Sequence, residues 1–76
     1  MKNLLAEIAM RLVDYPKKVK VNEIDGGQTS VLELSVAKQD IGKIIGRKGR
    51  NIKAIRTVMN AVSVKIHKRI IVEVLE

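Results

Sequence analysis

The strongest constraint on the fold is the spacing of apolar residues late in the chain. They recur three, four, three and four positions apart, at Ile52, Ile55, Met59, Val62 and Ile66. This spacing keeps one face of an α-helix apolar, so it predicts a long helix that ends near residue 66. Val64 and Ile66 could instead open a strand, but we prefer the helix because Ile66 completes the stripe.

Shorter patterns place the other elements before and after this helix. Apolar residues recur at helical spacing over 3–14, where Tyr15-Pro16 stops the pattern. Strict alternation predicts strands over 18–22, 30–36 and 69–75, and Asp25-Gly26-Gly27 is a turn signal between the first two. Asp40 is expected to cap a short helix over 41–45. The order α-β-β-α-α-β predicts an α+β sandwich of a three-stranded sheet with three helices on one face.

The size and composition limit the kind of protein. A chain of 76 residues is expected to form one domain over 1–76, with a thin core that a partner would help to bury. It has no cysteine, which removes disulfides and thiolate chemistry. No apolar run approaches the roughly 18 residues that would span a bilayer, and Glu7 and Arg11 interrupt the first segment, so neither membrane insertion nor a signal peptide is expected.

Positive charge is concentrated in one segment. The chain has 15 Lys and Arg against 8 Asp and Glu, which gives a net charge of +7. From Asp40 to Arg56 there are six cations and one acid, so +5 of this charge falls on 17 residues. Such clustering points first to nucleic acid and second to an anionic membrane surface.

A pair of glycines lies at the centre of this segment, in Ile44-Ile45-Gly46-Arg47-Lys48-Gly49-Arg50-Asn51-Ile52. Residues without a Cβ let a phosphate backbone approach, and the start of the next helix offers free N–H groups and its positive dipole end. Arg47 and Lys48 add cations. A helix C-cap followed by an ordinary turn remains the alternative. The spacing fits neither a nucleotide P-loop nor a dinucleotide fingerprint.

This run resembles the I-G-x-x-G-x-x-I pattern of KH domains, whose GXXG loop holds about four nucleotides of single-stranded backbone. The element order resembles the type II, prokaryotic variant. Leu12 to Pro16, Asp40 to Lys43 and Lys68-Arg69 are also similar to the small bacterial KH proteins of the KhpA family. The resemblance implies cytoplasmic single-stranded RNA binding, RNA chaperone activity, a link to cell elongation in some bacteria, and a homodimer or a heterodimer with a larger KH-containing protein. His67 departs from the glycine that often ends this helix, but histidine tolerates a positive φ.

Two sets of residues follow as candidate sites. The candidate RNA-binding residues are those in and around the GXXG loop: Lys43, Ile45, Gly46, Arg47, Lys48, Gly49, Arg50 and Lys53. Tyr15 is the only aromatic residue, so bases would lie on an aliphatic floor, for which Ile44, Ile45, Ile52 and the 31–36 strand are candidates.

The second set forms a separate stripe on the long helix, at Ala54, Val58 and Ala61. Two alanines beside a valine let another helix approach closely, which predicts a dimer interface. The alternative is that the stripe packs under the N-terminal helix.

Other functions are weakly supported by the sequence. His67 is the only histidine, it stands among Lys65, Lys68 and Arg69, and no carboxylate pair stands out, so we expect no enzyme, no cofactor and no metal site. A helix-turn-helix that reads DNA through Arg50, Asn51 and Lys53 is one rival. A dimerisation module whose basic charge is incidental is the other.

Overall fold

The computed structural model describes residues 1–76 and contains three helices and three strands. In chain order these are α1 (Lys2–Leu12), β1 (Lys20–Asp25), β2 (Thr29–Ser35), α2 (Ile41–Ile45), α3 (Arg50–Ile66) and β3 (Arg69–Val74). Three short 3-10 turns, η1 (Pro16–Lys18), η2 (Lys38–Asp40) and η3 (Arg47–Gly49), lie between them. None of the helices is both long enough and apolar enough to cross a membrane.

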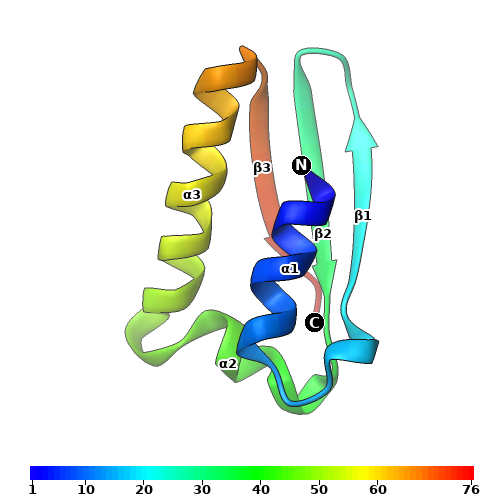
Figure 1. Cartoon of the computed structure of the whole chain (residues 1–76), viewed down its shortest axis with the longest axis vertical. Coiled ribbons are helices and arrows are strands. Elements are labelled where there is room, and N and C mark those ends of the chain that lie inside the picture. Colours follow the sequence, from blue (N-terminus) through cyan, green and yellow to red (C-terminus); the bar gives the residue numbers. More distant parts are fainter.

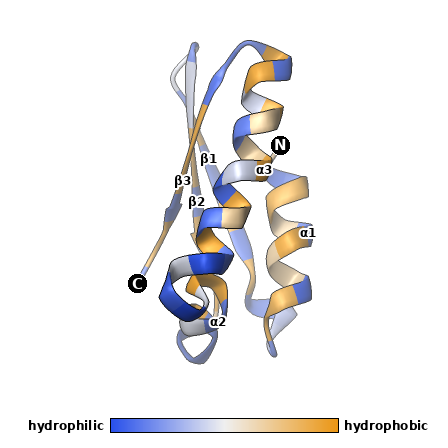
Figure 2. Ribbon diagram, turned by 90° about the vertical axis from the view of Figure 1, so that its left-hand side faces the viewer, coloured by the Kyte–Doolittle hydropathy of each residue, from blue (hydrophilic) through white to orange (hydrophobic).

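The sheet has the order β1-β2-β3 and is mixed. β1 and β2 pair as an antiparallel hairpin, with Lys20 opposite Ser35. β2 and β3 are parallel, with Leu32 opposite Val72, and a parallel pair needs a crossover connection. Here α2 and α3 supply the crossover. All three helices therefore lie on one face of the sheet (Figures 1 and 2), which confirms the α+β prediction.

The core lies between that face and the helices. Its buried apolar residues are Leu5, Ala9, Leu32, Leu34, Ile44, Ile52, Ile55, Met59, Ile70 and Val72. They come from all three helices and from β2 and β3. The edge strand β1 contributes only half-buried Val21, which packs against this core. The 41–45 helix and the long helix to residue 66 agree with the predicted ranges.

The apolar stripe that predicted α3 is buried along only part of its length. Ile52, Ile55 and Met59 are buried, but Val62 is only half-buried and Ile66 is 43% exposed. The last turns of α3 extend past the N-terminal end of α1, so no second helix covers them (Figure 1). His67 ends the helix at φ 56, in the left-handed region that the sequence allowed for it.

Three predicted boundaries are also wrong near the first connection. Helix α1 stops at Leu12 rather than residue 14, and β1 runs over Lys20–Asp25 rather than 18–22. Val13 is already extended, which ends α1 before residue 14. Lys18 belongs to η1, a 3-10 turn that begins at Pro16, and so does not pair with β2.

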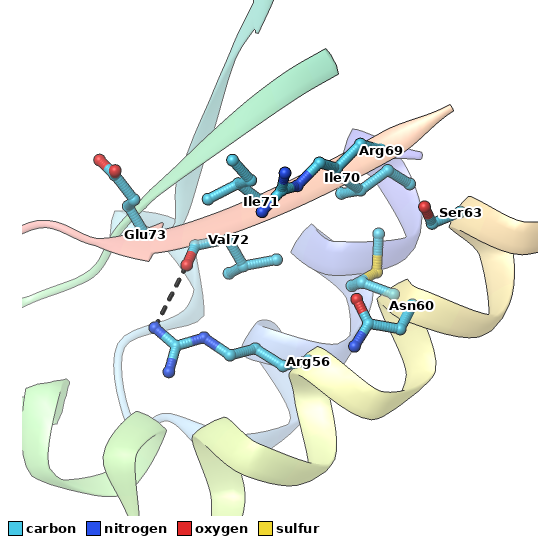
Figure 3. Close-up of a pocket in the computed structure, with 9 residues that line it drawn as sticks. Arg56, Asn60, Ser63, Arg69, Ile70, Ile71, Val72 and Glu73 are labelled. Atoms are coloured by element: carbon cyan, nitrogen blue, oxygen red, sulfur yellow. Dashed lines mark hydrogen bonds between the residues drawn. The ribbon is translucent and has the colours of Figure 1, made fainter. Parts of the chain in front are cut away.

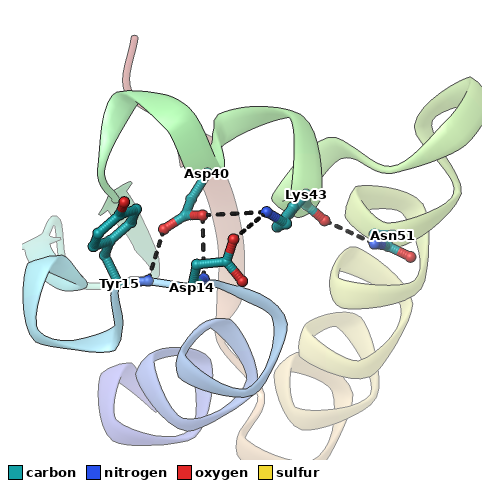
Figure 4. Close-up of polar contacts among 5 residues, drawn as sticks. All are labelled: Asp14, Tyr15, Asp40, Lys43 and Asn51. Atoms are coloured by element: carbon teal, nitrogen blue, oxygen red, sulfur yellow. Dashed lines mark hydrogen bonds and ion pairs between the residues drawn. The ribbon is translucent and has the colours of Figure 1, made fainter.

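Asp40 does not cap α2, contrary to the prediction. Its side chain makes no capping hydrogen bond and is fully buried. It instead accepts the backbone N–H groups of Asp14, at 3.1 Å, and Tyr15, at 3.0 Å (Figure 4). Asp40 therefore holds the connection after α1 against the start of α2.

Candidate nucleic-acid interface

The segment from Gly46 to Gly49 forms a tight turn between α2 and α3, which we call the GXXG loop. Three of its residues have positive φ: Gly46 at 77°, Lys48 at 56° and Gly49 at 74°. The Gly46 N–H donates to the Gly42 carbonyl at 2.8 Å, and the Gly49 N–H donates to the Gly46 carbonyl at 3.1 Å. The loop is thus held in a conformation that glycine adopts readily and other residues do not.

Position 46 requires glycine because there is no room for a Cβ, as well as because of its positive φ. A Cβ there would lie 2.7 Å from Cγ and 2.8 Å from the backbone N of Asn51. The Asn51 side chain occupies this place because its Nδ2 donates to the Lys43 carbonyl at 2.7 Å, which ties α2 to α3 (Figure 4). A Cβ on Gly49 would meet only Ile52 Cγ2, at 4.0 Å. Gly46 is therefore required both by its backbone conformation and by the lack of room for a Cβ, and Gly49 by its backbone conformation alone.

Asn51 is a residue whose role sequence reasoning missed. The sequence suggests for it only the role of a base-reading side chain in a DNA-binding helix. Its amide is instead committed to the Lys43 carbonyl. The signal is its position two residues after the second glycine, where a short polar side chain can reach back over the turn.

Four of the predicted cations are free. Arg47, Lys48, Arg50 and Lys53 are exposed and take part in no salt bridge. Two cations lie in the turn itself, and the start of α3 adds N–H groups that have no partner within the helix. The structure therefore brings positive side chains and a helix N-terminus together around one loop.

Lys43 is placed differently. Its Nζ lies 2.6 Å from an Asp14 carboxylate oxygen and 3.8 Å from one of Asp40. The hydrogen bond to Asp14 raises the pKa of Lys43, against a smaller opposing effect of desolvation, and charge attraction adds to the rise. Its positive charge is thus largely balanced by neighbours within the chain.

The isoleucines around the loop divide between core and surface. Ile44 and Ile52 are buried and belong to the core. Ile45 is half-buried and packs against that core from outside. Of the three isoleucines considered as a floor for bases, only Ile45 is partly accessible.

A groove runs between α3 and β3, and we call it the edge groove (Figure 3). It has a volume of about 430 Å³. Its lining is polar and apolar in similar measure and comprises Arg56, Met59, Asn60, Ser63, Arg69, Ile70, Ile71, Val72 and Glu73. Because β3 is at the sheet edge, one row of its backbone groups has no partner strand. Arg56 donates to one of these, the Val72 carbonyl, at 3.3 Å.

The predicted dimer stripe on α3 is exposed. Ala54, Val58 and Ala61 all reach solvent, and Val58 is 44% exposed, so the stripe is not packed under α1. Ala54 and Val58 line a second groove, between α1 and α3, with Ile8, Leu12, Asn51 and Ile55. We call it the helix groove. Its volume is about 240 Å³ and its walls are almost entirely apolar.

No group of three or more His, Cys, Asp or Glu side chains is arranged to hold a metal ion. His67 stands at the end of α3, away from the GXXG loop (Figure 1).

The sheet topology and the loop together define a type II KH domain. The hairpin and β3 belong to the same sheet, which distinguishes this fold from a helix-turn-helix. Comparison with protein families agrees, because the model described as "KhpA/KhpB, KH domain" matches residues 2–74. The chain belongs to this family of KH domains. The family is not enzymatic, so the prediction that the chain is not an enzyme is confirmed.

Similar proteins match along their whole length. The RNA-binding protein KhpA of Clostridium acetobutylicum is 53% identical over 75 residues, which cover 99% of this chain and 100% of the relative. The RNA-binding protein KhpA of Chlamydia pneumoniae is 50% identical, and the alignment covers 100% of this chain and 97% of the relative. That of Aquifex aeolicus is 43% identical, with 100% and 96% covered.

Among solved structures, the chain is similar to part of Era. Aquifex aeolicus Era bound to GDP and aluminium fluoride superposes with a TM-score of 0.61 at 26% identity. The same values hold for Era in complex with MgGDPNP and a segment of 16S ribosomal RNA. The match covers 96% of this chain and 28% of the Era chain.

Proposed function

We propose that the chain is a single KH domain over 1–76 that binds single-stranded RNA without catalysis, through the GXXG loop. The observation that carries this proposal is the loop itself, where two glycines with positive φ expose Arg47 and Lys48 at the start of a helix. Relatives that cover the whole chain are named RNA-binding proteins, and one solved Era structure holds ribosomal RNA. Both support RNA as the ligand.

Each residue of the loop has a distinct proposed role. Gly46 and Gly49 let the sugar-phosphate backbone approach, and Arg47 and Lys48 pair with phosphates. Arg50 adds positive charge at the start of α3, where the free N–H groups of the helix face the RNA phosphates.

The flanking residues have smaller proposed roles. Lys53 is one turn further along α3 and contacts the next phosphate of the RNA. Half-buried Ile45 makes an apolar contact with the bound RNA. Lys43 is at the margin of the site, because its charge is shared with Asp14 and Asp40.

The bases are proposed to lie in the edge groove. Its apolar floor of Met59, Ile70 and Val72 offers contact to base faces, while Asn60 and Glu73 offer hydrogen-bonding groups to base edges. Unpaired backbone groups of β3 add further partners. The GXXG loop of KH domains holds about four nucleotides of the backbone, which sets the expected size of the site.

The test is a charge reversal of the loop. We expect Arg47→Asp with Lys48→Asp to abolish RNA binding while the fold survives, because both side chains are exposed and unpaired. A matched control is Lys2→Asp with Lys65→Asp, which changes the net charge equally at exposed sites outside the loop. Binding is measured by fluorescence anisotropy of a labelled single strand, with duplex DNA as competitor. Equal RNA affinity in the folded loop variant and the wild type would contradict the proposal.

Salt dependence gives a second, independent check. If the loop neutralises about three to five phosphates, log K falls against log[salt] with a slope of roughly −2 to −3.5 for a single strand. A flat response would mean that the basic segment is only solvated surface.

We also propose that Ala54, Val58 and Ala61 form a dimer interface, in a homodimer or in a heterodimer with a larger KH-containing protein. The support is the helix groove, whose apolar walls stay open in the single chain, and the small side chains that let a second helix approach. A small domain gains stability from such burial.

Val58→Glu tests this interface, and Val64→Glu is its control. Val64 lies on the same helix, is 76% exposed and does not line the helix groove. We expect Val58→Glu to give a folded monomer in sedimentation, with wild-type circular dichroism, and Val64→Glu to leave the dimer intact. A Val58→Glu dimer as tight as the wild type would place the interface elsewhere.

The biological setting follows from the same proposal. Weak, sequence-tolerant binding in the cytoplasm suits an RNA chaperone or a post-transcriptional regulator, and a link to cell elongation would act through the bound RNAs. Strand-annealing rates of complementary RNAs, with wild type and the Arg47→Asp with Lys48→Asp variant, test the chaperone activity. Equal annealing with both proteins would contradict it.

A further inference from the structure

A second group of cations lies outside the GXXG loop but at the same end of the molecule. Lys17 and Lys18 are in η1, and Lys38 is in η2; all three are exposed. Figure 1 shows η1, the segment before α2, and the GXXG loop along this one end. We call Tyr15, Lys17, Lys18 and Lys38 the basic corner.

Hydrogen bonds fix the basic corner in place. Asp40, the last residue of η2, accepts the N–H groups of Asp14 and Tyr15, so the segment that enters η1 lies directly against η2. Lys38 is two residues before Asp40, and Lys17 and Lys18 follow Tyr15 by two and three. These side chains therefore extend from two segments that are joined at one point.

The acids near the basic corner do not neutralise it. Asp40 is fully buried and bonded to backbone N–H groups. Asp14 pairs with Lys43 at 2.6 Å. Lys17, Lys18 and Lys38 take part in no salt bridge. Their charge is thus available to an anion from solution.

Tyr15 is the second, independent sign of a ligand here. It is the only aromatic residue of the chain, and it is 50% exposed rather than part of the core. Its backbone is held on one side by Asp40 and restricted on the other by Pro16. An anchored, exposed ring among cations is suited to stacking with a nucleobase.

We propose that the basic corner is a second RNA contact, in which a base stacks on Tyr15 and the adjoining phosphates pair with Lys17, Lys18 and Lys38. RNA that leaves the GXXG loop then continues across α2 to this corner. The inference rests on the proposed RNA binding by the loop and extends the site beyond the about four nucleotides that the loop holds.

The experiment compares two lengths of RNA. A labelled single strand of four nucleotides fills the loop alone, and one of about ten nucleotides can reach both contacts. The variants are Tyr15→Leu, Tyr15→Phe, and Lys17→Gln with Lys18→Gln; the control is Lys2→Gln with Lys65→Gln. Each variant is compared with the wild type on the same RNA, because a longer strand also offers more registers to the loop. Circular dichroism checks that each variant is folded.

We expect Tyr15→Leu to weaken binding of the longer RNA about tenfold, within the range for one base stacked on an aromatic side chain. Binding of the short RNA does not change. Tyr15→Phe keeps the wild-type affinity because it keeps the ring. The two lysine changes weaken only the longer RNA, and the control changes neither. Since Tyr15 is the only aromatic residue, protein fluorescence reports on this ring alone, and the longer RNA but not the short one quenches it.

Several results would overturn the inference without touching the proposed function. One such result is that Tyr15→Leu and the Lys17→Gln with Lys18→Gln variant bind the longer RNA as tightly as the wild type does, while the Arg47→Asp with Lys48→Asp variant loses binding. Another is that the lysine variant loses affinity for anionic lipid vesicles but not for RNA, which would assign the corner to a membrane surface. Failure of the wild type to bind either RNA would instead refute the loop proposal and this inference with it.

Discussion

Replacing three glycines one at a time by alanine separates backbone strain from steric overlap around the GXXG loop. Gly42 lies within α2, has no positive φ, and a Cβ there would meet nothing within 4 Å. Gly49 has φ 74 but open space, and Gly46 has φ 77 and a Cβ that would lie 2.8 Å from the Asn51 backbone N. The three sites therefore form a graded series within eight residues of chain.

The expected changes in the free energy of unfolding follow from these contacts. Gly42→Ala stabilises the fold by about 0.5–1 kcal/mol, because alanine loses less backbone entropy in a helix. Gly49→Ala costs about 1–2 kcal/mol for the left-handed conformation. Gly46 has φ 77 and ψ 172, a region that essentially only glycine adopts, so Gly46→Ala costs about 1–3 kcal/mol in backbone strain. It also displaces Asn51, whose hydrogen bond to Lys43 contributes about 1 kcal/mol, so the total loss is about 2–4 kcal/mol.

Urea unfolding followed by circular dichroism measures the series. A domain of this length has a total stability of about 4–11 kcal/mol, so the loss at Gly46 lowers the midpoint clearly. Asn51→Ala in the Gly46→Ala background checks the mechanism, because it removes the overlap with Asn51 Cγ and leaves those with its Cβ and backbone N. Equal losses for Gly46→Ala and Gly49→Ala would refute the steric part of this reasoning. Destabilisation by Gly42→Ala would refute the helical part.

Three further expectations concern charged groups. Asp40→Asn loses about 1–3 kcal/mol of stability in urea unfolding, because one of the N–H donors of Asp14 and Tyr15 loses its acceptor. Asp14→Asn changes the stability far less, and equal effects would contradict the role of Asp40. The pKa of Asp25 is lowered, chiefly by the hydrogen bond from Lys68 and further by the one from the Gly27 N–H. The stability that the Asp25 carboxylate contributes is therefore present above about pH 3.9, and it is lost as the pH falls through the lower folded-state pKa. An NMR titration should show the Asp25 pKa rising in Lys68→Ala, and no change would contradict the assignment. Lys43→Gln should weaken RNA binding much less than Arg47→Gln, and the reverse order in anisotropy would show that Lys43 leaves its carboxylate partners for RNA.

The sequence predicts the elements of this fold well where a pattern is local and repeated. Ile52, Ile55 and Met59 follow the helical period and are buried, and alternation identifies the inward residues Leu32 and Leu34 of β2. Such periods arise because one face of each element contacts the core. The glycine pair was recognisable for the same local reason, since its neighbours fix the turn.

Tertiary contacts decided the features that the sequence did not predict. Asp40 precedes a helix and looks like a cap, but its partners are Asp14 and Tyr15, 26 and 25 residues away in sequence. Lys43 looks like one more cation of a basic segment until Asp14 is placed beside it. Ile66 completes a helical stripe, yet the element that would cover it is too short. None of these partners is visible in a local pattern.

The most direct measurement of the central claim is an NMR map of the backbone amides during titration with a single-stranded RNA of about four nucleotides. The account predicts that the largest shifts fall on Gly46, Arg47, Lys48 and Gly49 and at the start of α3, with smaller shifts along the edge groove. Shifts confined to the open face of the sheet, or to the helix groove with the loop unchanged, would contradict the claim that the GXXG loop holds the RNA backbone.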